Sequence, residues 1–185
     1  MPAKDQTESQ GVLPGGRWSI DPDRSSVRFA IKHMALKTLH GSFKEFTGSI
    51  DLRDGHPTAE GSVSAASIDT GDAIRDGHLR ESPDFFDVER HPEITFRSTL
   101  IAPTGGRGLR VEGDLSMRGQ THPISLEGQL EDEPQDGPGG RRITLELRGQ
   151  LSRKDFGLTW NQALDAGGAL LGNRVRIELT LSAYS

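Results

Sequence analysis

The sequence predicts an all-β fold, an antiparallel β-barrel of about eight strands with a short helical insert. Alternation of apolar and polar residues recurs along the chain, and this period of two is typical of strands. The 23 glycines and 10 prolines are spread over 185 residues and divide them into short segments. The hydrophobic content of 32% fits sheets with one polar face. A β-sandwich is the main alternative.

The composition of the chain limits the number of domains and the classes of site and partner that it can have. A chain of 185 residues favours a single domain. The absence of cysteine excludes disulfides, thiol nucleophiles and cysteine-ligated zinc. The net charge of −5 lacks the basic character of a nucleic-acid binder, so we expect no nucleic-acid partner. No run approaches the roughly 18 apolar residues of a membrane span, so no integral membrane segment is expected.

The beginning of the chain differs from the rest. Residues 1–16 lack the apolar core of a secretory signal. We therefore expect a flexible tail over residues 1–15, a barrel domain over residues 16–185 and a cytoplasmic location.

The first expected strands cover residues 17–21 and 26–34. In the second, one face carries Val27, Phe29, Ile31 and His33, so a histidine ends an otherwise apolar row. Residues 43–52 follow, with Phe43 as a core candidate and an irregular spacing that predicts a bulge or bend. Residues 60–68 are small and weakly patterned.

A helical insert is expected over about residues 71–79, with a second turn near residues 83–86. Asp69 or Thr70 could cap this helix. The helix is too short to persist alone and must be held by the sheet. Arg75 and Asp76 are sequence neighbours and cannot pair on a regular helix, so Asp69 and Asp155 are candidate partners for Arg75.

Strands are expected again over residues 93–101, 108–117, 122–130, 142–151 and 174–183. Residues 117–120 predict a tight hairpin turn, and residues 131–140 a mobile hairpin loop. Residues 152–173 form a long connection. The last strand has an apolar face made of Val175, Ile177, Leu179 and Leu181.

Neither a metal site nor a catalytic site has a recognisable motif. The six histidines show no metal-binding spacing. Ser67, Asp69 and His78 are the right types for nucleophilic catalysis, but no local motif brings them together. We therefore expect no metal, no cofactor and no enzymatic activity.

Segments spread in order from Trp18 to Ala183 resemble the YceI-like family. They include Trp18-Ser19-Ile20-Asp21, Arg75-Asp76-Gly77-His78-Leu79, Asp84-Phe85-Phe86-Asp87, His91-Pro92-Glu93-Ile94-Thr95-Phe96 and Arg153-Lys154-Asp155-Phe156-Gly157-Leu158. The resemblance implies a lipocalin-like barrel whose apolar interior binds a polyisoprenoid or a related lipid. It also implies a homodimer.

The functional hypothesis is that the barrel binds, and sequesters or carries, a long apolar chain. The ligand-binding candidates are the apolar strand faces and the polar residues of the insert and of the long connection: Phe29, Ile31, His33, Phe43, Arg75, Asp76, His78, Phe86, Phe96, Asp155 and Phe156. Two alternatives stay open. One is a small hydrolase or isomerase that uses His33, Asp76 and His78, and the other is a stress-related interaction protein with a filled barrel. Ordinary core packing and helix anchoring are the simpler interpretations of the same residues.

Overall fold

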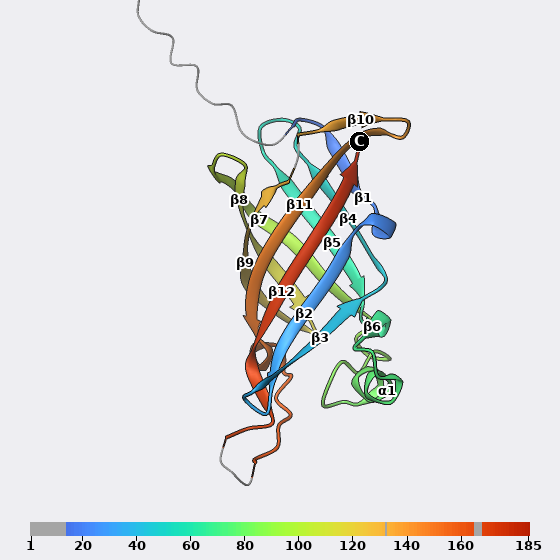
Figure 1. The fold of residues 1–185 in the computed structure, drawn as a ribbon, viewed down its shortest axis with the longest axis vertical. Helices are drawn as coiled ribbons and strands as arrows, with labels where there is room; N and C mark the ends of the chain where they lie inside the picture. The colour runs from blue at the N-terminus through green and yellow to red at the C-terminus, as the bar shows by residue number, and fades with distance from the viewer. Residues whose placement is uncertain (1–13, 132, 165–167) are drawn as a thin grey trace, which may run out of the picture.

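The computed structural model describes residues 14–131, 133–164 and 168–185 (Figure 1). It shows an antiparallel β-barrel with a helix beside one end. Most of the tail expected over residues 1–15 lies outside the described residues. No helix within the described ranges has the length and apolar character needed to cross a membrane.

The order of the elements follows the expected alternation of strands and turns. The strands are β1 Arg17–Ile20, β2 Ser26–His33, β3 Lys37–Phe43, β4 Phe46–Asp51, β5 Thr58–Ser64, β6 Ile68–Asp69, β7 Glu93–Gly105, β8 Gly108–Met117, β9 Gln120–Leu130, β10 Gln135–Gly137, β11 Gly140–Ser152 and β12 Leu171–Tyr184. The helices are η1 Pro22–Arg24, η2 Ala65–Ser67, α1 Ala73–Glu81 and η3 Arg153–Phe156.

Pairing of β12 with β11 closes the barrel. The neighbours run β11-β9-β8-β7-β5-β4-β1-β12, and β12 pairs back to β11 from Arg142↔Tyr184 to Ser152↔Arg174. After η1, β2 continues β1 along the same edge of β12, and β3 and β6 extend this side. The result is an eight-stranded barrel in which β1–β2, β3–β4 and β5–β6 are interrupted strands. A sandwich of two separate sheets is excluded, because neighbouring strands are hydrogen-bonded all the way around one closed ring.

Three local expectations were wrong. The strand β3, Lys37–Phe43, was not expected: Leu39 and Phe43 alternate with polar residues, but Gly41 interrupts their apolar row, and the pairing with β2 is a tertiary property. Asp72, rather than Asp69 or Thr70, caps α1. Within residues 131–140, Gln135–Gly137 form β10 and pair with β11. The bend after Phe43 and the Met117↔Gln120 hairpin are confirmed.

A tryptophan closes one end of the barrel. Trp18 is fully buried and packs with Leu109, Leu130, Ile143 and other apolar side chains from the barrel wall. The guanidinium carbon of Arg141 lies 5.9 Å from the centre of its ring. The helix α1 lies at the opposite end of the barrel from β1, which carries Trp18 (Figure 1).

Candidate ligand-binding site

An apolar cavity of about 500 Å³ occupies the barrel interior. Its walls include inward side chains from four strands: Val27, Phe29 and Ile31 of β2, Ile124 and Leu126 of β9, Leu145, Leu147 and Leu151 of β11, and Val175, Ile177, Leu179 and Leu181 of β12. Small-molecule sites typically have volumes of roughly 300–1,000 Å³. The interior therefore holds open space that a barrel filled by its own side chains lacks.

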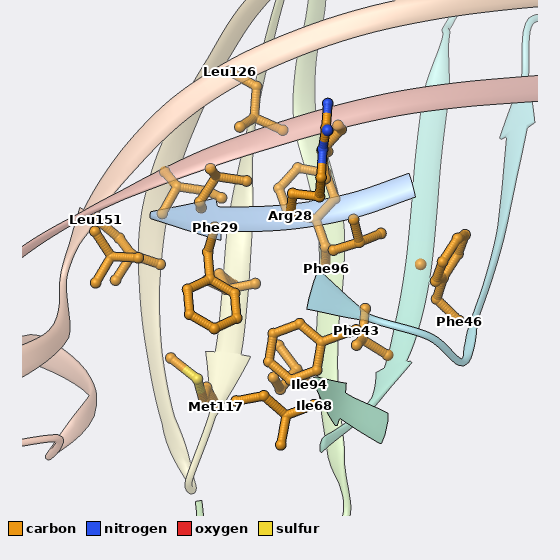
Figure 2. A pocket seen from close by; sticks show the side chains of 18 of the residues that line it. Arg28, Phe29, Phe43, Phe46, Ile68, Ile94, Phe96, Met117, Leu126 and Leu151 are labelled. Atoms are coloured by element: carbon orange, nitrogen blue, oxygen red, sulfur yellow. The ribbon is translucent and has the colours of Figure 1, made fainter. Parts of the chain in front are cut away.

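The strand register explains why the cavity wall is apolar. Val27, Phe29 and Ile31 alternate along β2 and lie opposite Leu179, Ile177 and Val175 of β12. Both rows point inward because side chains of directly paired residues share one face of the sheet. Figure 2 shows the Phe29 ring within the cavity and the Arg28 side chain leaving β2 on the opposite side.

Aromatic rings gather where β2, β3 and the chain after α1 meet. The rings of Phe29 and Phe43 have centres 5.6 Å apart, and Phe86 contacts Phe43 edge-on at 5.8 Å. Phe29 lies directly over Gly41, where any Cβ would collide with the ring. Phe96 of β7 lies over Gly113 of β8 in the same way. All four rings line the cavity.

The helix α1 is attached through one carboxylate to Thr70, the residue that follows β6. Asp76 is only 6% exposed and accepts hydrogen bonds from the backbone N–H and the hydroxyl of Thr70, at 2.9 and 2.5 Å. The Thr70 hydroxyl oxygen in turn accepts a hydrogen bond from Nε of Arg75 at 2.8 Å. Thr70 therefore links the two side chains that cannot meet directly. The Arg75 guanidinium also donates to the Thr70 carbonyl, and among the described residues it forms no ion pair with Asp69 or Asp155, so the expected carboxylate partners were wrong.

The first turn of α1 is stabilised by Asp72. Its carboxylate accepts hydrogen bonds from the N–H groups of Arg75 and Ile74, and the bond from Arg75 is the main reason why the pKa of Asp72 is lowered. A lowered folded-state pKa means that the cap contributes stability above the carboxyl's ordinary pKa and loses it as the pH falls through the lowered value. Arg75, whose backbone N–H donates to this cap, also borders the cavity.

Polar and aromatic side chains together form the rim of the polar end, which we call the mouth. His33 ends β2 there, and His78 packs edge-on against Phe85, whose ring centre is 5.5 Å from that of Trp160. Arg75 and these four residues all line the cavity. The mouth therefore offers hydrogen-bond donors around an apolar interior.

Arg153 is a buried cation beside the mouth. Its guanidinium donates to the carbonyl oxygens of Leu158, Trp160 and Gly172 at 2.5 to 2.8 Å. Burial lowers the pKa of Arg153, because desolvation disfavours its charged form. The four residues belong to η3, the following loop and the start of β12, so this side chain holds the end of the barrel together.

The structure brings most of the candidate residues to the cavity. Its lining includes Phe29, Ile31, His33, Phe43, Arg75, His78, Phe86 and Phe96. Asp76, Asp155 and Phe156 are outside the lining: Asp76 anchors α1, Asp155 is exposed in η3, and Phe156 is buried against His122, with ring centres 5.2 Å apart. Contact of any of these residues with a ligand stays a prediction.

Sequence reasoning did not single out several lining residues. Ile177 and Leu179 were identified as one apolar face but not as part of a site, and the alternation of β12 was the signal for them. Arg153 belongs to a segment that resembles the family but was not chosen as a site residue, and Trp160 had no signal of its own, because both positions depend on how the chain after η3 folds over the barrel end. Across the described parts of the chain, no group of three or more acidic or histidine side chains could hold a metal ion.

A family model described as a YceI-like domain matches residues 18–183. The chain belongs to the YceI-like family. Two similar relatives are Protein YceI of Escherichia coli O157:H7, 34% identical over 155 residues, and Protein YceI of Salmonella newport (strain SL254), 36% identical over 154 residues. The first alignment covers 81% of this chain and 80% of the relative, and the second covers 80% of each.

Solved structures share the barrel of this YceI-like protein. BcnA of Burkholderia cenocepacia superposes with a TM-score of 0.74 at 23% identity, covering 88% of this chain and 98% of BcnA. A polyisoprenoid binding domain from Saccharophagus degradans, implicated in plant cell wall breakdown, gives a TM-score of 0.68 at 17% identity, covering 91% and 98% of the two chains. At these identities the likeness shows the fold, and the expected lipocalin-like barrel is confirmed.

Proposed function

We propose that this YceI-like protein binds a polyisoprenoid or a related long-chain lipid inside its barrel and withdraws the chain from water. The apolar cavity, closed by Trp18 at one end and bordered by polar groups at the other, is the observation that carries the proposal. The solved polyisoprenoid binding domain with the same barrel supports it.

The driving force is burial of the hydrocarbon chain. Each buried CH₂ group contributes about 0.8 kcal/mol, so ten such groups give a gross term of roughly 8 kcal/mol. Immobilisation of a flexible chain offsets part of this gain. Because every CH₂ group is alike, the tail supplies affinity and discriminates weakly between lipids.

Selectivity between head groups then belongs to the mouth. Arg75 and His78 border the cavity there, and the only carboxylate among the described lining residues is Glu60 on β5, whose side chain is 61% exposed. Arg75 uses Nε and one terminal nitrogen to contact Thr70, which leaves further N–H donors for a ligand. We propose that this arrangement binds an oxygen-bearing head group.

The role proposed here is binding rather than catalysis. The His78→Ala variant separates the two: it weakens lipid binding in a carrier, whereas it eliminates turnover in an enzyme. A cytoplasmic location and a homodimer remain proposals that follow from the sequence and from the family resemblance, and fractionation and light scattering test them.

The decisive experiment is solvent extraction of the purified protein followed by mass spectrometry. We expect a stoichiometric long-chain lipid, or stoichiometric uptake of an added polyprenol by the extracted protein. The Phe29→Asp variant should lose this uptake and several kcal/mol of stability, because it leaves an unpaired carboxylate in an apolar wall. Phe29→Leu keeps the wall apolar and should retain uptake. A wild-type protein that neither holds nor takes up lipid contradicts the proposal.

A further inference from the structure

Large apolar side chains are exposed at the mouth. The structure exposes five such side chains among the residues it describes: Met34, Leu36, Ile74, Leu100 and Tyr184. Leu36, at 91%, and Ile74, at 88%, are the most exposed of these. Leu36 lies with Met34 in the turn between β2 and β3, and Ile74 lies in α1. Both elements lie at the same end of the barrel (Figure 1). Leu100 lies in β7 and Tyr184 near the end of β12.

The β2–β3 turn presents these side chains in an unusual backbone conformation. Met34 and Ala35 have φ angles of 53° and 57°, in the left-handed region where Gly, Asn and Asp are most common. The exposed Leu36 follows them directly. Turn geometry therefore favours small polar residues at this position, and folding alone does not account for an apolar Met-Ala-Leu tip.

The apolar tip adjoins the opening of the cavity. The backbone N–H of Met34 donates to the carbonyl of Leu170 at 2.8 Å. Leu170 lines the cavity, and so does His33, the residue before Met34. The tip therefore lies directly beside residues that line the cavity.

Positive charge flanks the tip although the whole chain carries −5. Lys32 and Lys37 are exposed, stand on either side of the turn, and form no ion pair with the part of the chain that the structure describes. Lys32 donates to the hydroxyl of Thr38 at 3.0 Å. The helix that carries Ile74 adds no positive charge, because Asp72, Asp76 and Glu81 outnumber Arg75 and Arg80 there. The positive charge therefore belongs to the turn alone.

We propose that the mouth docks on a lipid bilayer with anionic head groups. In this arrangement Met34, Leu36 and Ile74 enter the apolar boundary, while Lys32 and Lys37 bind the head groups. Apolar side chains beside lysines are the combination that anchors proteins in a membrane interface. A second copy of this chain fits less well, because a symmetric contact through the tip would bring four lysines together. Docking would let a lipid pass from the bilayer into the barrel without exposing its tail to water. This use of docking rests on the proposed function.

The test is sedimentation of the protein with vesicles made of equal amounts of phosphatidylcholine and phosphatidylglycerol. We expect wild-type protein to bind these vesicles, and to bind phosphatidylcholine vesicles more weakly. Leu36→Asp should lower the binding constant about tenfold or more, since it removes an inserted side chain and adds a repelled charge. Leu100→Asp adds the same charge on the barrel wall and should change binding little. Lys32→Ala and Lys37→Ala should each cost about fivefold and reduce the dependence on salt.

Two further measurements separate this proposal from its alternatives. Uptake of a polyprenol delivered from ethanol should be normal in Leu36→Asp, because the substitution lies outside the cavity. If wild-type protein takes up no polyprenol but still binds vesicles through Leu36, docking stands and the proposed function fails. Wild-type protein that ignores the vesicles, or equal effects of Leu36→Asp and Leu100→Asp, would overturn docking. If the wild-type protein is a dimer in the absence of vesicles and Leu36→Asp dissociates it, the tip is an interface with a second copy of the chain and docking is wrong.

Discussion

At the scale of single residues, two glycines make room for aromatic rings in the cavity wall. Gly41 of β3 lies opposite Phe29 of β2, and Gly113 of β8 lies beneath the ring of Phe96 of β7. Glycine weakens a strand, but it lets a neighbouring side chain lie flat on the backbone. The rings thus cover the wall and leave the centre of the barrel open.

The Gly41→Ala variant tests this role. A Cβ at Gly41 would overlap the Phe29 ring, so we expect the ring to move into the cavity, the polyprenol capacity to fall and the free energy of unfolding to drop by about 1–3 kcal/mol. Urea unfolding and probe stoichiometry measure the two effects. Gly61→Ala is the control, because its Cβ would approach the Thr47 carbonyl only to an ordinary 3.4 Å. Equal behaviour of the two variants would contradict the assignment.

At the scale of elements, a short helix owes its position to the sheet beside it. An isolated helix of 9 residues is only marginally stable in water, because its few hydrogen bonds barely offset the free-energy cost of nucleation. Capping by Asp72 begins α1, and the bonds between Asp76 and Thr70 hold the helix beside the end of β6. The backbone N–H groups of Phe86 and Val88 then donate to the carbonyls of Leu79 and Arg80, so the following chain folds back on the helix.

The Asp76→Ala variant should release α1 from the barrel. It removes both acceptors of the Thr70 N–H and hydroxyl, and an unsatisfied buried donor costs about 1–3 kcal/mol. Hydrogen exchange of the amides in residues 73–81 should accelerate more than exchange in β11. Asp84→Ala, at an exposed carboxylate in the turn after α1, should leave exchange unchanged. Slow exchange of α1 in Asp76→Ala would show that other contacts position it.

At the scale of the whole molecule, closure of the barrel determines that the interior is hollow. Eight strands whose apolar faces point inward enclose a volume that their side chains do not fill. Trp18 and the residues around it fill one end, and Arg153 ties the strands and loops of the other. Empty apolar space is unfavourable, because its lining loses van der Waals partners.

A bound lipid should therefore raise the stability of the whole barrel. At a free polyprenol concentration of about one hundred times Kd, the free energy of unfolding should increase by about 2.7 kcal/mol. For a domain of this size each kcal/mol raises Tm by roughly 2–4 °C, so we expect a rise of about 5–10 °C in the extracted protein. Differential scanning calorimetry measures it, and Phe29→Asp should show no rise. An unchanged wild-type Tm would mean that the ligand does not enter the fold.

The sequence by itself determined which side of each strand is apolar. A period of two assigns Phe29 and Ile31 of β2 and Ile177 of β12 to one face wherever those strands pair. The barrel and the helical insert could be predicted from such local patterns together with the family resemblance. Eight of the candidate residues chosen in this way line the cavity.

Only the tertiary structure decided what that apolar face encloses. Whether a ring of strands is filled or hollow depends on strand number, stagger and the sum of side-chain volumes, which no local pattern contains. Contacts between distant segments likewise selected Thr70 as the partner of Arg75, brought Arg153 under the loop at Trp160, and left Leu36 and Ile74 exposed at one end.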